Sequence, residues 1–141
     1  MAKPLAYDSS NTVNVNEAFE VDWGDGTYLP YVAGDASAVA SNADSGIITV
    51  RSSNQPTQIK FITDTYAEID VTESSSLTSC DSICQDLYTL LTFNIADTSN
   101  VTSMSSAWVN CYELTSFPLI DTSNVVNFDS AWWACFGLIT F

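Results

Sequence analysis

The pentapeptide Asp-Thr-Ser-Asn-Val occurs twice in the chain, at residues 97–101 and 121–125, a step of 24 residues. In both copies Ala-Trp and then a cysteine follow at the same offsets. A fixed period of this length is typical of repeat architectures, in which each repeat packs mainly on its neighbours. No other feature of the sequence constrains the fold as strongly.

Framed on this period, the second half of the chain divides into residues 67–90, 91–114 and 115–138, with the start of a fourth repeat at 139–141. Within each repeat an alternating apolar stretch is followed by apolar residues at wider spacing, which predicts a strand and then an irregular or 3₁₀-like helical segment. We expect the strands to stack about 4.8 Å apart into a parallel sheet, as in leucine-rich solenoids. Apolar positions stay in register between the repeats, in the series Ile69, Phe93, Phe117 and Phe141 and the series Val71, Ile95 and Leu119.

The polar residues of the repeat have a structural role. Asp, Thr, Ser and Asn side chains bond to nearby backbone groups and cap turns. We expect each copy to cap the turn that follows the strand, and aligned copies to bond to the same side chain one repeat away. The predicted structural ladder consists of Asp97, Asn100, Asp121, Asn124, Cys111 and Cys135.

The stretch "DTSNVTSMSSAWVNCYELTSF" resembles the BspA-type leucine-rich repeat of the mycoplasma-lipoprotein and bacterial-surface-antigen family. Trp108 and Trp132 stand where that family has a buried Phe, so the resemblance implies that both lie in the core. The repeat at 67–90 lacks the family's aspartate, asparagine and cysteine. The resemblance covers about half the chain, and it implies that residues 67–141 form a short solenoid of the leucine-rich-repeat type. The matching residues are Asp97, Thr98, Ser99, Asn100, Val101, Met104, Cys111 and Leu114, and again residues 121–125, Cys135 and Leu138.

Residues 1–66 lack this period. Phe19, Val21 and Trp23 alternate toward Gly-Asp-Gly, which predicts a hairpin, and "GIITVRSS" and "QIKFI" are further predicted strands. The stretch "VDWGDGT" is similar to the signature of PKD-like immunoglobulin-type β domains, which often precede BspA-type repeats in surface and phage virion proteins. We therefore expect a mainly β chain, in which residues 1–66 form a small β domain or a reduced cap on the solenoid.

The charge balance is strongly acidic, with 17 acidic residues against three bases and a net charge of −14. Binding nucleic acid through phosphates requires a positive surface, so we expect no nucleic-acid partner. We also expect no membrane insertion, because no apolar run approaches the roughly 20 residues that span a bilayer. The N-terminal stretch lacks an apolar segment of signal-peptide length, so no secretion signal is expected.

Few residues suggest chemistry. The chain has no histidine, which excludes Ser-His-Asp and Cys-His arrangements and His-bearing zinc sites. The carboxylate pairs Asp22 with Asp25 and Glu68 with Asp70 could do acid–base work, but a turn aspartate and solvated strand acids explain them more simply. A calcium site at residues 22–26 would need about 6 to 8 oxygen ligands and lacks the usual loop pattern. We predict no catalytic residue, cofactor or metal.

The four cysteines are Cys80, Cys84, Cys111 and Cys135. Cys111 and Cys135 share one repeat position, so their Cβ vectors would be parallel, a poor geometry for a disulfide. The spacing also lacks the paired CxxC of a four-cysteine zinc site. We expect four buried, free thiols that act as small apolar side chains.

Two surfaces are candidates for contacts. Trp133 should point outward, aligned with Val109, and the apolar layer of the last repeat lacks the polar cover that a solenoid end needs. The candidate interface therefore comprises Trp133, Val109, Trp132, Phe128, Ile139 and Phe141. On the polar strand face, for which solvation is the simpler interpretation, the candidates are Glu68, Asp70, Thr92, Asn94, Ser116 and Pro118.

Together these features predict a non-enzymatic structural or interaction module on the surface of a phage virion, such as a head decoration or fibre-associated subunit. Its partners would be other copies of itself, or another virion or surface protein, docked at the open C-terminal end; a glycan or host surface is a further candidate. A fragment of a bacterial cell-surface adhesin is the close alternative. A carbohydrate-active hydrolase that uses the acidic strand face is a distant one.

Overall fold

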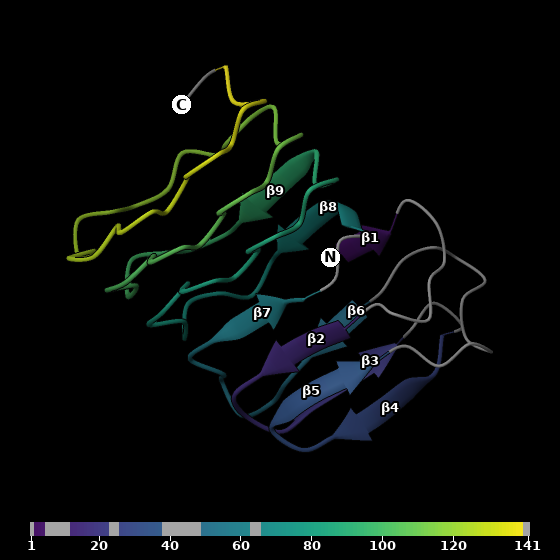
Figure 1. Ribbon diagram of the computed structural model, residues 1–141. Coiled ribbons are helices and arrows are strands. Elements are labelled where there is room, and N and C mark those ends of the chain that lie inside the picture. The colour runs from purple at the N-terminus through teal and green to yellow at the C-terminus, as the bar shows by residue number, and fades with distance from the viewer. Residues whose placement is uncertain (1, 5–11, 23–25, 38–48, 63–65, 140–141) are drawn as a thin grey trace.

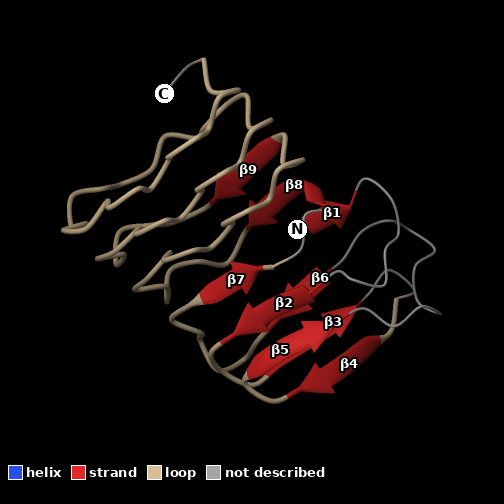
Figure 2. Ribbon diagram, viewed as in Figure 1, coloured by secondary structure: helices blue, strands red, loops and turns tan. Residues whose placement is uncertain are grey.

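The computed structural model describes residues 2–4, 12–22, 26–37, 49–62 and 66–139. Within these ranges the chain consists of strands and turns with no helix (Figure 2), so the prediction of a mainly β protein is confirmed. In the same residues no helix is long and apolar enough to cross a membrane. Trp23, Asp25 and Phe141, all named above, lie outside the described residues.

The N-terminal half contains two small antiparallel sheets, with strand orders β5-β2-β7 and β4-β3-β6 (Figure 1). Alternate residues are buried, namely Val13 and Val15 on β2 and Phe19 and Val21 on β3, and all four join one hydrophobic cluster. The alternation places one side of each strand in the core, as a half-buried strand requires. The strands are β2 (Thr12–Val15), β3 (Phe19–Asp22), β4 (Tyr28–Tyr31), β5 (Gly34–Ser37), β6 (Thr49–Arg51) and β7 (Ile59–Phe61).

The strands that flank Gly-Asp-Gly pair as the sequence predicts. Phe19 lies opposite Tyr31 and Asp22 opposite Tyr28. Gly26 adopts a φ of 84°, a left-handed conformation that glycine accepts without a Cβ clash. Its N–H donates a 3.0 Å hydrogen bond to Oδ1 of Asp22. Asp22 therefore has a turn-capping role.

A third sheet of order β1-β8-β9 joins the two halves of the chain (Figure 1). β8 (Tyr66–Val71) and β9 (Thr92–Ile95) are parallel, with Ile69 opposite Phe93 and Val71 opposite Ile95. These are the pairs that the repeat alignment predicts. β1 (Ala2–Pro4) covers the other edge of β8 in antiparallel fashion.

We refer to residues 67–90, 91–114 and 115–138 as the first, second and third coils. Figure 1 shows the coils side by side, running from teal to yellow. Hydrogen bonds link equivalent places, such as Cys80 N–H to the Ser103 carbonyl and Met104 N–H to the Asn127 carbonyl, both 2.9 Å. The residue series Ser79, Ser103 and Asn127 forms parallel bridges across all three coils.

The segment after each strand, expected to be irregular or 3₁₀-like, is a run of tight turns, and the described coils contain no helix. Residues with positive φ recur at equivalent positions, at about the values that interrupt a right-handed helix. Many N–H groups in these turns bond to the next coil instead of to a carbonyl of their own coil. The positive φ angles are those of Ser82 (55°), Asp86 (64°), Ser106 (54°), Asn110 (62°), Ser130 (56°) and Ala134 (61°).

The third coil departs from the predicted register. Leu119 aligns with the buried Ile95, yet it is 101% exposed, while its neighbour Ile120 packs partly against the core. Pro118 precedes Leu119 and has no N–H to contribute to a strand ladder. Only the bridge between Thr92 and Ser116 continues the sheet, and no strand forms over residues 117–120.

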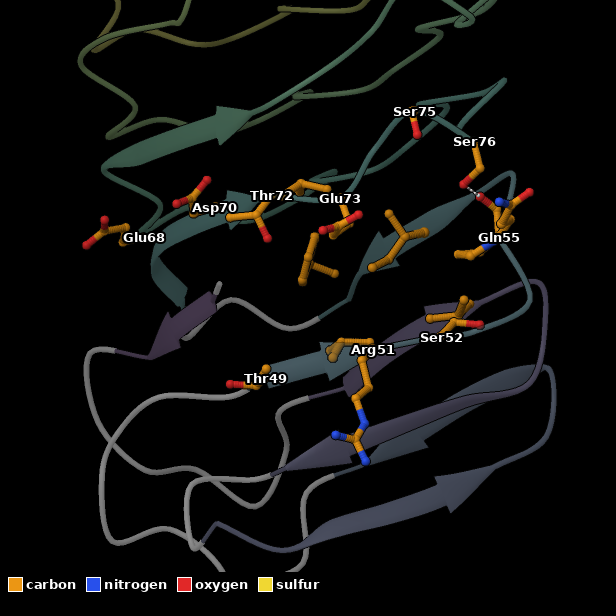
Figure 3. Close-up of a pocket in the computed structure, with 16 residues that line it drawn as sticks. Thr49, Arg51, Ser52, Gln55, Glu68, Asp70, Thr72, Glu73, Ser75 and Ser76 are labelled. Carbon is orange, nitrogen blue, oxygen red and sulfur yellow. Dashed lines mark hydrogen bonds between the residues drawn. The ribbon is translucent and has the colours of Figure 1, made fainter.

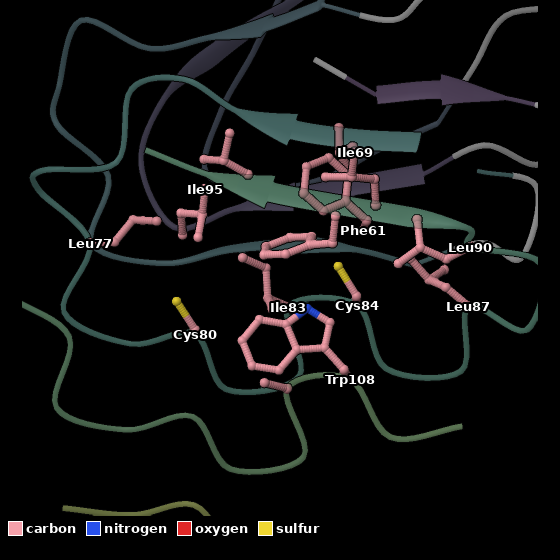
Figure 4. Packing of buried hydrophobic residues seen from close by; sticks show 14 of the residues in the cluster. Phe61, Ile69, Leu77, Cys80, Ile83, Cys84, Leu87, Leu90, Ile95 and Trp108 are labelled. Carbon is pink, nitrogen blue, oxygen red and sulfur yellow. The ribbon is translucent and has the colours of Figure 1, made fainter. Parts of the chain in front are cut away.

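One hydrophobic cluster runs from the N-terminal sheets into the coils (Figure 4). Phe61, on β7, lies near Ile83 of the first coil in that view, and its N–H donates a 2.8 Å bond to the Ile83 carbonyl. Thr78 N–H donates to the Thr57 carbonyl at 3.0 Å. The N-terminal half therefore covers one side of the first coil, and the third coil is the outermost at the other end.

Candidate interaction surface on the third coil

The repeated aspartates cap their turns as predicted. Asp97 Oδ1 accepts a 2.8 Å hydrogen bond from the N–H of Ser99, and Asp121 Oδ1 accepts one of 2.8 Å from the N–H of Ser123. These N–H groups stabilise the ionised carboxylates and lower the pKa of Asp97 and of Asp121. The ladder thus begins with a local bond in each copy.

The asparagines supply the bonds between coils. Asn100 Nδ2 donates to the Ser75 carbonyl at 2.9 Å, and Asn124 Nδ2 donates to the Ser99 carbonyl at 2.7 Å. The expectation that aligned copies bond to the same side chain is therefore wrong for these residues, because each amide reaches a main-chain carbonyl of the preceding coil. By the same step, the Ser123 carbonyl occupies the acceptor position on the third coil.

The cysteines also reach back to the preceding coil. Cys111 Sγ donates to the Cys84 carbonyl at 3.1 Å and Cys135 Sγ to the Trp108 carbonyl at 2.9 Å. All four thiols are free, but Cys135 is only partly buried, so the expectation of four buried thiols holds for three. Burial raises the pKa of the Cys80 thiol to about 12, and it also raises the pKa values of the Cys84 and Cys111 thiols.

Aromatic rings stack from coil to coil inside the core. The rings of Trp108 and Trp132 are 5.4 Å apart and inclined by 13°, and those of Phe93 and Phe117 are 6.1 Å apart. Trp108 is fully buried, as predicted. Trp132, also predicted as a core residue, is only partly buried. The inner aromatic column therefore loses its cover at the third coil.

A second aromatic column lies on the surface and was missed by sequence reasoning. Tyr88 and Tyr112 have ring centroids 5.1 Å apart, and Tyr112 and Phe136 are 5.6 Å apart. Their exposed fractions rise along the stack from 38% to 42% to 81%. The signal was an aromatic letter that recurs at the repeat period. This column ends on the largely exposed ring of Phe136.

The predicted interface residues are exposed to different degrees. Trp133 is 65% exposed, and Phe128 and Ile139 are exposed as well. Val109, expected to lie beside Trp133, is instead buried at 8%, because this repeat position is open only where no further coil follows. Six large apolar side chains in the third coil and at the residue after it are exposed, and we call them the third-coil surface: Leu119, Val126, Phe128, Trp133, Phe136 and Ile139.

Backbone donors accompany this apolar surface. In the second coil the N–H groups of Met104, Ser106 and Asn110 donate to carbonyls of the third coil at 2.8 to 2.9 Å. Their equivalents in the third coil have no hydrogen-bond acceptor among the described residues. Unpaired N–H groups beside apolar side chains need water or a partner backbone. These open donors belong to Phe128, Ser130 and Ala134.

The polar strand face is assembled as the alignment predicts. Glu68 lies opposite Thr92, and Asp70 lies opposite Asn94, in the parallel register of β8 and β9. Ser116 continues the row through its bridge to Thr92. Pro118 follows at the point where the strand is lost. The side chains of Glu68 and Asp70 also line a cavity.

This cavity, of about 560 Å³, lies between β8 and the strands β6 and β7 (Figure 3). Three carboxylates line it, those of Glu68, Asp70 and Glu73, together with hydroxyl groups and an apolar surface that includes Phe61. Figure 3 shows Arg51 directed away from these acids. Its Nε bonds to a Glu20 carboxylate oxygen at 2.6 Å, and the guanidinium lies 3.5 Å from the centroid of the Tyr28 ring. The cavity walls thus favour cations without presenting an evident catalytic arrangement.

Among the described residues, no group of three or more potential ligands is placed to hold a metal ion. In comparisons with known proteins, no family model, no curated protein and no solved structure matches the chain. The third-coil surface is therefore considered on its own geometry.

Proposed function

We propose that the chain is a non-enzymatic structural and interaction module that binds a protein partner through the third-coil surface. One observation carries the proposal: the third coil and Ile139 directly after it expose six large apolar side chains, and the same coil has backbone N–H groups without an acceptor among the described residues. Large exposed apolar surfaces mark interaction sites in soluble proteins. Trp and Tyr are enriched among the residues that dominate binding energy, which makes Trp133 the leading contact.

The second half of the chain, on this proposal, is a short solenoid of three coils spanning residues 67–138, and residues 1–66 form a separate β region. Support comes from the bonds that recur one repeat apart, including those of Asn100 and Asn124. Support for a covering role of residues 1–66 comes from the bond between Phe61 and Ile83. Solenoid ends require such a cover.

For the location of the module we propose the surface of a phage virion, with a bacterial cell surface as the alternative. The support is the sequence resemblance to BspA-type repeats and to PKD-like domains, together with a net charge of −14, which favours solubility. A labelled antibody against the chain provides the test. Binding to purified phage particles supports the virion proposal, binding to intact cells supports the adhesin alternative, and binding to neither contradicts both.

The interface itself is tested by light scattering on the chain alone over a wide concentration range and on mixtures of the chain with purified virion or surface proteins. We expect association that weakens in Trp133→Asp and in Phe136→Asp, because a charge introduced at a contact must be desolvated. Val32→Asp is the matched control, since Val32 is 82% exposed but lies in the N-terminal half. A chain that stays monomeric, and that binds no virion or surface protein in a way sensitive to these variants, contradicts the proposal.

A further inference from the structure

The open face of the third coil has a directional pattern of donors. Within the described coils, every second N–H group of the turns donates toward the following coil, as Trp108 does to the Ala131 carbonyl at 2.8 Å. The third coil repeats this orientation. The N–H groups of Phe128, Ser130 and Ala134, which are two and four residues apart, therefore face the side on which a further coil would lie. A matching surface must offer carbonyls at the same interval.

Acceptors on the same face complete the pattern. The Thr102 carbonyl accepts a 2.9 Å bond from Val126 N–H, and the Ser99 carbonyl accepts the Asn124 amide. One repeat later the equivalent acceptors are the carbonyls of Val126 and Ser123. A matching surface therefore needs an asparagine amide and a backbone N–H at the places where the repeat itself carries them.

The aromatic columns add a third requirement. Phe136 ends the exposed column and is 81% exposed, and this column would continue against a ring placed one repeat further on. In the inner column, Phe128 of the same coil already stacks on Trp132, with ring centroids 5.9 Å apart. The donors, acceptors and rings therefore match one more coil of the same repeat. We call the side of that coil that would face the third coil its leading side.

An identical copy of this chain cannot offer that side. On the first coil, the Ile83 carbonyl already accepts the N–H of Phe61, and Thr78 N–H is bonded to the Thr57 carbonyl. β1 covers the free edge of β8. The leading side of the first coil is therefore occupied by the chain's own N-terminal half, which prevents head-to-tail stacking of identical copies.

We propose that the third-coil surface docks an uncovered coil of the same 24-residue repeat, stacked in parallel register. The inference rests on the proposed function and names the partner of that surface. Charge is compatible with it, because residues 115–139 contain only two acidic residues, Asp121 and Asp129, out of 17 in the chain. A partner coil that is itself mildly acidic meets little repulsion there.

The test supplies such a coil at high effective concentration, because ordering a free peptide opposes binding. The sequence of residues 91–114 is joined to the C-terminus of the full chain through a flexible Gly-Ser linker. The probe of docking is amide hydrogen exchange at Phe128, Ser130 and Ala134, which should slow by about tenfold or more when the N–H groups become bonded. A tethered coil of the same composition in scrambled order is the control.

Two variants sharpen the result. Phe136→Asp in the parent chain should restore fast exchange despite the tethered coil, whereas Val32→Asp should not. Asn100→Ala within the tethered copy should weaken the protection, because it removes the amide that reaches the Ser123 carbonyl.

The outcomes separate this inference from the proposed function. Unchanged exchange, or equal protection by the scrambled coil, overturns the coil partner. If in addition Phe136→Asp abolishes self-association of the untethered chain, the interface stands but its occupant is a second copy in a different arrangement. If Phe136→Asp affects neither property, both proposals are wrong.

Discussion

Asn124 donates a 2.7 Å hydrogen bond from its side-chain amide to the main-chain carbonyl of Ser99, in the preceding coil. Asn100 makes the equivalent bond to Ser75 at 2.9 Å. The asparagine at this repeat position therefore joins each of these two coils to the preceding coil. Both amides are exposed, so competition with water keeps the net contribution of each bond modest.

Asn124→Ala should lower the free energy of unfolding by about 0.5 to 1.5 kcal/mol, the usual net contribution of one hydrogen bond. Urea unfolding followed by tryptophan fluorescence measures the change. Asn54→Ala is the control, because the Asn54 side-chain amide has no recorded bond among the described residues. Equal effects of the two substitutions would show that the bond to Ser99 does not stabilise the fold.

Thr98 and Thr122 occupy the same repeat position in different surroundings. Thr98 is buried, and its hydroxyl donates to the Asp121 carbonyl at 2.8 Å. Thr122 is exposed, and its hydroxyl has no recorded partner in the described residues. Thr98→Val, which keeps the shape of the side chain, should cost about 1 kcal/mol in unfolding free energy, and Thr122→Val should cost almost nothing. A reversed order in urea midpoints contradicts this assignment.

Trp108 is fully buried, and within the described structure its indole N–H has no hydrogen-bond partner. An unpaired buried donor costs about 1 to 3 kcal/mol, so Trp108→Phe removes that penalty while it loses some packing. We expect the two effects to offset each other to within about 1 kcal/mol, whereas Trp108→Ala should cost about 3 to 5 kcal/mol. Thermal unfolding of both variants provides the measurement, and a Phe variant as unstable as the Ala variant would contradict the expectation.

Cys80 links stability to alkaline pH. Burial raises the pKa of its thiol from 9.0 to about 12, so above pH 9 the unfolded chain loses a proton that the folded chain retains. The stabilising contribution is complete below pH 9 and is lost as the pH rises toward 12, at no more than about 1.4 kcal/mol per pH unit.

Removing the Cys80 thiol should make this decline less steep. Urea midpoints for Cys80→Ala and the parent chain, measured from pH 8 to 11, should therefore converge as the pH rises. Cys135→Ala provides the comparison: burial raises the pKa of this thiol as well, but the thiol is only partly buried, so its removal should change the pH profile less. Parallel pH profiles for Cys80→Ala and the parent would refute the link.

Much of the second half could be predicted because repetition restricts the alternatives. The register of Ile69 with Phe93 follows directly from the repeat period, as does the capping of each turn by its aspartate. The kind of turn could not be predicted. Apolar residues at wider spacing suit a helical segment and a run of left-handed turns equally well, and only the hydrogen bonds to the neighbouring coil favour the turns.

The candidate surface was predicted in part. Trp133 and Ile139 were identified as exposed at the end of the stack, whereas Phe136 and Leu119 were not. The exposure of Leu119 was missed because leucine fits the apolar series of Val71 and Ile95. The strand does not continue after Pro118, and Leu119 therefore points away from the core. The acidic cavity beside β8 also escaped prediction, since its walls come from segments with no sequence relation to one another.

The sequence by itself determined the β class, the repeat period and the parallel register, because these follow from local alternation and from letters that recur at a constant step. Tertiary structure alone decided which copies are buried: Leu114 is fully buried, while Leu138, at the same repeat position, only packs partly against the core. Identical residues have identical local conformational preferences, but the burial of each one depends on whether another coil packs against its own coil. No further coil covers the third coil among the described residues, so its apolar side chains remain exposed.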